Sequence, residues 1–321
     1  MNRIFYATDS PLISGGHYVL RDHVIGLRSL GLEAYVLASK RSLVKEYARF
    51  MAEDWVVVAD KGLPVNPEDY VVIPEPWRDL INLLQKINVK KILHVQNPFY
   101  IFHGFSSVNS LNEYGLSSVI SCSTFTTSYL CNLRVAPPVF TVRPKIDNVF
   151  FKSFKKHIRV CYMPRKRRIE AEFIRGLFSS MYPRLASVEW ISIDGISRDA
   201  AAEIMCSSRV FLSLNRLDGL GLPPLEAMAA GCIPVGFAGG GGAEYATAAN
   251  GYWHSEEDYI GIVHSIALVL GFDEKTDVLS MMREKGRITA DDFSNEKFLA
   301  SLHNFWQPLV PTASQRITAS T

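Results

Sequence analysis

Short apolar runs bounded by turn residues alternate along the chain with longer amphipathic stretches. This alternation is typical of βαβ units, so it predicts α/β domains with mostly parallel sheets. It occurs twice, and the second series begins at residue 159. Strands are expected at 3–7, 34–38, 55–59, 70–73, 91–95 and 118–122, and then at 159–163, 188–193, 210–214 and 233–237. Helices are expected at 18–30, 77–87, 170–181, 198–206, 260–270 and 295–306.

Between the two series lies APPVFTVRPKIDNVFFKSFKKH, which is rich in Pro and Lys and poor in periodicity. A chain of 321 residues also exceeds what one hydrophobic core usually organises. We therefore expect two Rossmann-like domains, 1–152 and 153–292, facing one another across a cleft. The helical segment 293–310 is expected to pack back toward the first domain, and the polar tail 311–321 to be poorly ordered.

Composition and charge exclude several classes of protein. Apolar residues make up 48% of the chain, but no window approaches the roughly 18 uninterrupted apolar residues of a membrane span, so any membrane contact is expected to be peripheral. The net charge of +2 is far below the basic excess of a nucleic-acid binder, and no nucleic-acid partner is expected.

The N-terminus and the cysteines indicate a compartment. MNRIFYATDS lacks the apolar segment and cleavage site of a signal peptide, which favours a cytoplasmic protein. The five cysteines are scattered and form no CxxC pair, as expected for reduced, buried thiols rather than a zinc site or a disulfide framework. No Asp-x-Asp metal motif is present either, so no metal cofactor is expected.

Residues 215–231, NRLDGLGLPPLEAMAAG, follow the expected strand 210–214. Ligands of open α/β sheets bind beyond the carboxyl ends of strands, so this position favours a binding loop. Gly219 and Gly221 can adopt positive φ and allow a ligand to approach the main chain. Pro223 and Pro224 suit the first turn of a helix, where a missing N–H costs nothing.

Glu226 is expected in that first turn, where the helix dipole favours a carboxylate. An ionised Glu can accept two hydrogen bonds, which matches neighbouring hydroxyls such as those of a nucleotide's ribose. The alternative is an ordinary capped helix with Glu226 solvated at its start. Further along, Gly239 to Gly242 in AGGGGAEYATAANGYW either supply amide donors to a ligand or form a plain flexible loop.

The core DGLGLPPLEAMAAGCIPV resembles the motif of retaining glycosyltransferases of the GT-B fold, family 4-like (group 1). The resemblance implies a metal-independent enzyme that moves a sugar from a nucleotide-sugar donor to an acceptor: a glycan, as in polysaccharide biosynthesis, a lipid or a small molecule. It implies that Glu226 holds the donor ribose and that Asp218 contacts the donor sugar, although the family has Glu there. Main-chain groups near Gly219, Gly221, Leu222 and Pro223 would face the donor.

Sugar transfer leaves negative charge on the departing phosphate, and fixed cations stabilise it. MPRKRR at 163–168 follows a strand, and the planar guanidinium of arginine suits phosphate oxygens. The resemblance implies that Arg165 holds the diphosphate together with a second cation. Lys166, Arg167 and Arg168 are the candidates for that second cation, with Lys166 and Arg167 preferred as catalytic and donor-binding contacts respectively. The alternative is a solvated charged face.

The first domain offers two further groups of candidates. Adjacent glycines, Gly15 and Gly16, precede the expected first helix and can present amides to a phosphate, as in the family's N-terminal glycine loop. In KILHVQNPF, His94 and Gln96 lie on one strand face. The family has a His-Asp-like pair on the acceptor side about where Gln96 and Asn97 stand, so the usual His is missing there and His94 is the candidate substitute. A core histidine is the alternative for His94.

Other functions remain open at this point. GT-B proteins include sugar-nucleotide epimerases and phosphorylases, and a non-catalytic protein that binds a sugar nucleotide or a glycan would share the same pocket. A dehydrogenase is less consistent with the sequence, because SGGHYV does not complete a GxGxxG pattern.

Overall fold

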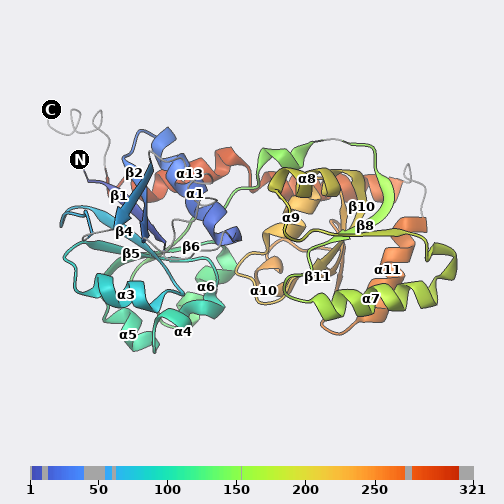
Figure 1. Ribbon diagram of the computed structural model, residues 1–321, viewed down its shortest axis with the longest axis horizontal. Helices are drawn as coiled ribbons and strands as arrows, with labels where there is room; N and C mark the ends of the chain where they lie inside the picture. Colours follow the sequence, from blue (N-terminus) through green and yellow to red (C-terminus); the bar gives the residue numbers. More distant parts are fainter. Residues whose placement is uncertain are drawn as a thin grey trace. The chain divides into compact units, whose positions relative to one another are not determined.

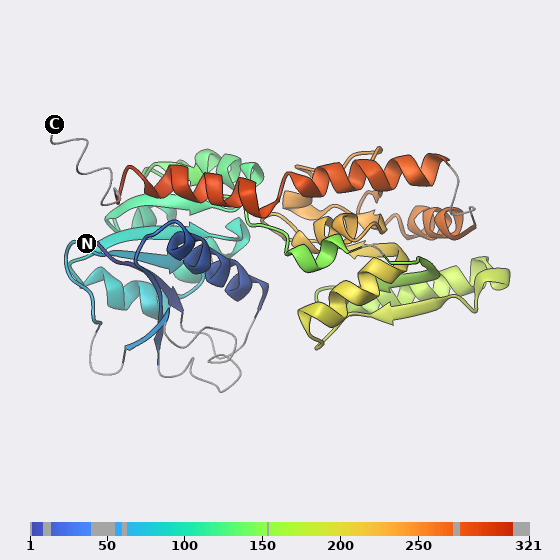
Figure 2. The ribbon, with the colours of Figure 1, turned by 90° about the horizontal axis from the view of Figure 1, so that it is seen from above.

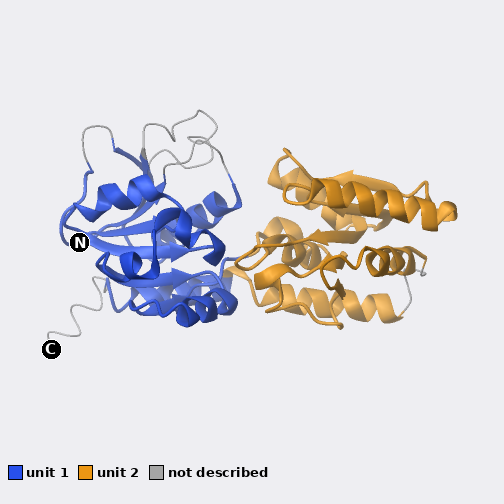
Figure 3. Cartoon of the chain, turned by 90° about the horizontal axis from the view of Figure 1, so that it is seen from below, with its two compact units in different colours: residues 1–145, 296–321 blue, residues 146–295 orange. Residues whose placement is uncertain are grey.

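The computed structural model describes residues 2–8, 14–39, 55–59, 63–152, 154–271 and 277–310. The chain divides into two compact units (Figure 3). Unit 1 comprises Met1–Lys145 and Glu296–Thr321, and unit 2 comprises Ile146–Asn295. The expected tail 311–321 lies outside the described residues.

Unit 1 is built on a parallel sheet with the strand order β3-β2-β1-β4-β5-β6-β7. Its strands are β1 (Ile4–Thr8), β2 (Ala34–Ser39), β3 (Val56–Ala59), β4 (Tyr70–Pro74), β5 (Lys90–Val95), β6 (Leu116–Ser121) and β7 (Val139–Thr141). Its helices are α1 (Gly15–Ser29), α3 (Arg78–Gln85), α4 (Ile101–Gly104), α5 (Val108–Asn112), α6 (Thr124–Asn132), α13 (Asn295–Trp306) and the 3-10 helix η3 (Pro98–Tyr100).

Both faces of this sheet are buried, because helices cover each of them. Successive side chains of a strand point to opposite faces and therefore enter different cores. In β1, Ile4 and Tyr6 pack in one core with α1 and α13, whereas Phe5 and Ala7 pack in another with α3, α4 and α6. Helix α13 returns to unit 1 from the far end of the sequence and lies beside α1 (Figure 2). Its fully buried Trp306 contacts the Tyr70 ring edge-on, at a centroid distance of 5.5 Å.

Unit 2 is built on a second sheet, with the order β12-β11-β10-β8-β9, and all of its described pairings are parallel. Helices α7 and α11 pack on one face of it, and α8 and α9 lie on the other (Figure 1). Its strands are β8 (His157–Tyr162), β9 (Glu189–Ser192), β10 (Ser208–Leu214), β11 (Ile233–Phe237) and β12 (Tyr252–His254). Its helices are η4 (Asn148–Phe151), α7 (Arg168–Met181), η5 (Pro183–Leu185), α8 (Arg198–Ser207), α9 (Leu222–Ala229), α10 (Gly239–Gly242), α11 (Tyr259–Gly271) and α12 (Asp277–Asp291).

The strand order reverses once in each sheet, between β1 and β4 in unit 1 and between β8 and β10 in unit 2. At such a point the two flanking strands send their following loops to opposite faces of the sheet. Open α/β sheets bind ligands at the carboxyl ends of these strands. The stretches 163–168 and 215–231 follow β8 and β10, so both leave the sheet at the reversal in unit 2.

Each expected strand and helix is present, with ends shifted by a few residues. The short elements β7, β12, α4 and α5 were not expected, because they carry too few residues to show a period. The longer helices α6 and α12 were not expected either. One cysteine differs from expectation: Cys131 is exposed on α6, whereas the other four are buried.

The structure divides the chain earlier than the expected boundary at 152/153, since unit 2 starts at Ile146. The Ile146 amide donates to the Phe293 carbonyl at 2.8 Å, and the Phe150 carbonyl accepts from the Cys206 thiol at 3.6 Å. These contacts tie 146–151 to unit 2 although the segment is Pro- and Lys-rich in sequence.

Candidate active site

The loop after β10 is shaped by Gly221, which stands at the N-cap of α9 with a φ of +84°. A side chain there is disfavoured by backbone conformation and by space, because a Cβ atom would lie closer than 3.0 Å to Asn215 Nδ2. The Tyr245 hydroxyl donates to the Gly221 carbonyl at 2.6 Å. Leu222 begins the helix, and because Pro223 and Pro224 lack N–H groups, it is the only one of the first three helical residues that can present an amide to a ligand.

Residues 239–242, expected as amide donors or a plain loop, form the short helix α10 and pack against the β10 loop. The amides of Gly240 and Gly241 donate to the carbonyls of Arg216 at 3.0 Å and Asp218 at 2.8 Å. A Cβ atom on Gly241 would overlap the Gly219 main chain, so the two loops touch backbone to backbone. The glycine run therefore shapes the site through close packing.

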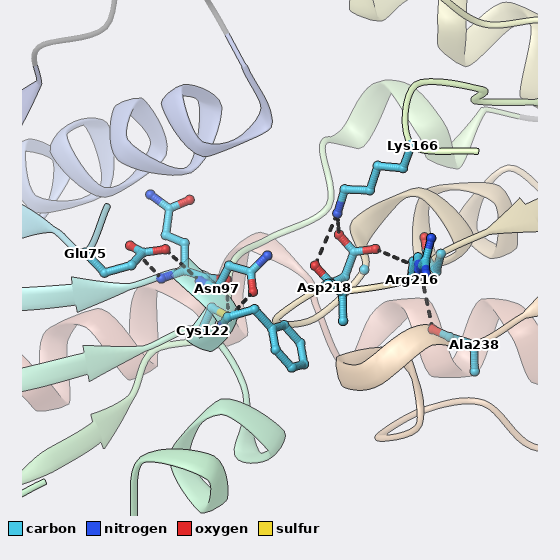
Figure 4. Close-up of polar contacts among 12 residues, drawn as sticks. Glu75, Asn97, Cys122, Lys166, Arg216, Asp218 and Ala238 are labelled. Atoms are coloured by element: carbon cyan, nitrogen blue, oxygen red, sulfur yellow. Dashed lines mark hydrogen bonds and ion pairs between the residues drawn. The ribbon is translucent and has the colours of Figure 1, made fainter. Parts of the chain in front are cut away.

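Lys166 and Asp218, which the sequence separates widely, form an ion pair in unit 2 (Figure 4). Lys166 Nζ also donates to the Leu217 carbonyl at 3.3 Å, and the Arg216 amide donates to Asp218 Oδ2 at 3.2 Å. The two side chains are 28% and 21% exposed, so both remain accessible to a ligand. Arg165, next to Lys166, is exposed. A cation and a carboxylate are thus placed at the reversal between β8 and β10.

The structure separates Arg167 and Arg168 from this pair. The Arg167 side chain is 1% exposed, and its Nη2 donates to both Glu256 carboxylate oxygens, at 2.7 and 2.6 Å. Its guanidinium also lies 4.4 Å from the centre of the Phe237 ring. Arg168 pairs with Asp194 at 2.5 Å. Both arginines are therefore used in contacts within unit 2, and Arg167 in particular is enclosed.

Glu226 lies in the second turn of α9, not in the first as expected, because the helix already begins at Leu222. Its side chain is 10% exposed, and Oε1 accepts from Arg198 Nη2 at 3.1 Å. Burial raises the pKa of Glu226, and the charge of Arg198 opposes that rise. What stabilises the ionised carboxylate is therefore an arginine, and its distance from the helix end weakens the dipole argument.

In unit 1, Gly15 and Gly16 are the first two residues of α1 rather than part of the preceding turn. The capping box of Ser14 and His17 closes the helix start. Gln96 lies on the same side of the sheet, and its Nε2 donates to the Gly16 carbonyl at 3.2 Å. The two predicted groups of unit 1 are thus directly connected.

His94 and Asn97 have different surroundings. His94 is 1% exposed, its ring lies 4.8 Å from that of His23, and burial lowers its pKa to about 4. It is a neutral core histidine. Asn97 Oδ1 accepts from the Phe99 amide at 3.1 Å and so caps η3.

Sequence reasoning missed Glu75, which directly follows β4. Its carboxylate is buried and accepts hydrogen bonds from the amides of Gln96 and Asn97 (Figure 4). The available signal was an acid immediately after a fully apolar strand, in YVVIPEPW, at a strand end where ligands bind.

The described part of the chain contains no group of three or more His, Cys, Asp or Glu side chains arranged to hold a metal ion. Among those same residues, no helix has the length and apolarity to cross a membrane.

Comparison with known proteins identifies the chain. The family model of glycosyl transferases group 1 matches residues 184–287. An alpha-1,6-glucosyltransferase of Actinobacillus pleuropneumoniae serotype 7 (strain AP76) is 33% identical over 243 residues, which are 74% of this chain and 73% of that relative.

Solved structures of low identity share the fold over nearly the whole chain. HepE of Anabaena, in complex with UDP and glucose, superposes with a TM-score of 0.73 at 11% identity and covers 96% of this chain and 100% of its own. The pneumococcal O-GlcNAc transferase GtfA, in complex with UDP and GlcNAc, gives 0.72 at 11% identity, with 97% and 99% covered. The expected GT-B fold of two Rossmann-like units is confirmed, and the chain belongs to the group 1 glycosyltransferases.

Proposed function

We propose that the enzyme transfers glucose from UDP-glucose to the 6-hydroxyl of an acceptor sugar, with unit 2 binding the donor and unit 1 the acceptor. The observation that carries this proposal is the placement of Lys166, Asp218 and the Gly221 loop at the strand reversal of unit 2. The 33% identical alpha-1,6-glucosyltransferase supports the sugar and the linkage. HepE, whose structure holds UDP and glucose, supports the nucleotide.

Within unit 2 we assign the donor groups as follows. The Glu226 carboxylate binds the ribose hydroxyls through the oxygen that is not engaged by Arg198. Leu222 presents its amide to the diphosphate, and Lys166 and Arg165 neutralise the charge that develops on the leaving phosphate. Asp218 keeps Lys166 in place and contacts the sugar.

Three finer points belong to the same proposal. Retention is supported by the alpha product of the relative, since UDP-glucose itself carries an alpha-linked sugar. Metal independence is supported by the cations Arg165 and Lys166, and undiminished transfer in the presence of EDTA would test it. A cytoplasmic location is supported by the five free cysteines. A role in polysaccharide biosynthesis is supported by the linkage that the alpha-1,6-glucosyltransferase relative is named for.

The decisive experiment measures UDP-glucose binding by calorimetry. Glu226→Ala removes two hydrogen bonds to a charged group, worth about 1.5 kcal/mol each, and is expected to weaken binding by about a hundredfold. Glu203→Gln is the control, because Glu203 is an exposed acid of the same unit. Unchanged affinity in the Glu226→Ala variant would overturn the assignment.

Glu226 also pairs with Arg198, so the variant needs a second comparison. Arg198→Met removes the ion pair but keeps the carboxylate. If Glu226→Ala weakens UDP-glucose binding and Arg198→Met does not, the carboxylate contacts the ligand directly. Equal losses in the two variants would mean that binding needs the intact Arg198–Glu226 pair.

A further inference from the structure

Glu75 occupies the position in unit 1 that corresponds to the binding edge of an open sheet. It follows β4, which pairs with β1 where the strand order reverses. The residue is 3% exposed. Among the described residues, no lysine, arginine or histidine forms an ion pair with its carboxylate, so its role is not that of a salt-bridge partner.

The carboxylate instead holds the backbone where the chain leaves β5. Glu75 Oε1 accepts from the Asn97 amide at 2.9 Å, and Oε2 accepts from the Gln96 amide at 3.3 Å. The Gln96 carbonyl in turn accepts from the Cys122 thiol at 3.1 Å. Three successive strand ends, those of β4, β5 and β6, are therefore joined through this turn.

The same turn controls two side chains that are candidates for the acceptor side. Gln96 Nε2 reaches the Gly16 carbonyl at 3.2 Å in the first turn of α1, and Asn97 Oδ1 caps η3. Loss of the carboxylate would leave the amides of Gln96 and Asn97 without their acceptors. The orientation of both side chains depends on that backbone.

We propose that Glu75 is a positioning residue for acceptor binding, because its carboxylate holds the Gln96–Asn97 turn in the conformation that presents the half-buried Gln96 side chain to the acceptor sugar. This inference rests on the proposed function in one respect, namely that the acceptor binds at this edge of unit 1. The hold on the turn follows from the contacts of Glu75 alone.

The charge of Glu75 is sensitive to pH near neutrality. Burial raises its pKa to about 7, against the hydrogen bonds from the backbone amides. An ionised carboxylate accepts both amides, whereas a protonated one carries a hydroxyl that competes with them. The hold on the turn is therefore present above pH 7 and is lost as the pH falls through this value.

The titratable side chains around Glu75 do not change in the same range. Burial raises the pKa of the Cys122 thiol to about 12, so it remains a donor. Burial lowers the pKa of His17 on α1, which keeps that ring neutral near pH 7. Arg78, on the helix that follows Glu75, donates to the carbonyls of Phe102 and His103.

The test compares Glu75→Gln with Glu68→Gln, a control in the same unit whose side chain is 73% exposed. Initial rates are measured from pH 5.5 to 8.5 with UDP-glucose as donor and p-nitrophenyl glucoside as acceptor. In wild type and in the control, kcat/KM for the acceptor is expected to fall as the pH drops through about 7. In Glu75→Gln the acceptor KM rises about tenfold and the pH dependence disappears, while calorimetric UDP-glucose affinity stays unchanged. A wild-type KM and pH profile in this variant would overturn the proposal.

A second measurement follows hydrogen exchange of the Gln96 and Asn97 amides and does not depend on any substrate. In wild type, protection beyond the intrinsic exchange rate should decrease as the pH falls through about 7, and in Glu75→Gln it should be low throughout. Equal protection in the two proteins would refute the hold on the turn even if transfer were found. If UDP-glucose does not bind at all, the proposed function fails while this measurement still decides the role of Glu75. Should Glu75→Gln not fold, Glu75→Asp serves, because its shorter side chain cannot reach both amides.

Discussion

Replacement of Gly221 by alanine should destabilise unit 2 and distort the loop that carries Asp218. Two costs add. The φ of +84° places an L-residue in the left-handed region, at about 1–2 kcal/mol, which is offset in part by the smaller entropy of the unfolded chain, about 0.4–1 kcal/mol. The backbone cost alone is therefore about 1 kcal/mol.

The second cost is steric. The new Cβ atom would displace the Asn215 side chain, whose Nδ2 donates to the Ala238 carbonyl at 3.3 Å. Asn215 is 7% exposed, so the displaced amide and the abandoned carbonyl lose a partner in a buried place, at about 2 kcal/mol. The free energy of unfolding should fall by about 3 kcal/mol in total.

Urea unfolding followed by tryptophan fluorescence measures this change, and Gly195→Ala is the matched control. Gly195 lies in the same unit with a φ of +67°, and a Cβ atom there has no neighbour within 4 Å. It therefore reports the backbone cost alone, about 1 kcal/mol. Equal losses of stability in the two variants would show that packing around Gly221 contributes nothing, and the reasoning would be refuted.

Three further predictions concern charge. Burial lowers the pKa of His94 from 6.5 to about 4, so the folded state favours the neutral ring. The contribution of His94 to the free energy of unfolding is therefore complete above pH 6.5 and falls by up to about 3 kcal/mol as the pH drops toward 4. Unfolding curves of His94→Leu measured over this pH range should lack that part of the decrease. Lys166→Gln should lower kcat by about a hundredfold through the loss of one fixed cation, with stability changed by less than about 1 kcal/mol, as rates and urea curves would show. Arg167→Met should lower the free energy of unfolding by about 2 kcal/mol and leave the UDP-glucose affinity of the folded protein unchanged. Arg165→Met should instead weaken UDP-glucose binding and leave the free energy of unfolding unchanged, because Arg165 is exposed. Calorimetry and urea unfolding of both variants separate the two effects.

Much of the architecture could be predicted from local patterns in the sequence. Runs such as 210–214 and 233–237 are apolar, short and bounded by turn residues, so they identify buried parallel strands without any knowledge of their neighbours. The short helices after β5 lack such a period, and they went unrecognised. Helix α9 was expected with Pro223 and Pro224 in its first turn, as observed, but Glu226 was placed in that turn as well and lies in the second.

The sequence predicted the location of the candidate site but not which side chains meet there. The motif 215–231 indicates where a ligand loop lies, because glycines and prolines restrict the backbone in ways that can be read residue by residue. It does not indicate which cation of 163–168 faces that loop. Glu75 was missed for a related reason, since its partners, the amides of Gln96 and Asn97, are main-chain groups that no side-chain pattern displays.

Local pattern was enough to predict the two α/β units, the strands in chain order and a resemblance to a glycosyltransferase family, because these follow from periodicity and a contiguous motif. The pairing of Lys166 with Asp218, and the burial of its neighbour Arg167 beside Glu256, could be seen only in the folded protein. Adjacent residues in a turn point in different directions, and their partners arrive from distant parts of the chain. That choice depends on how the strands pair and which loops they bring together, which is a property of the folded sheet.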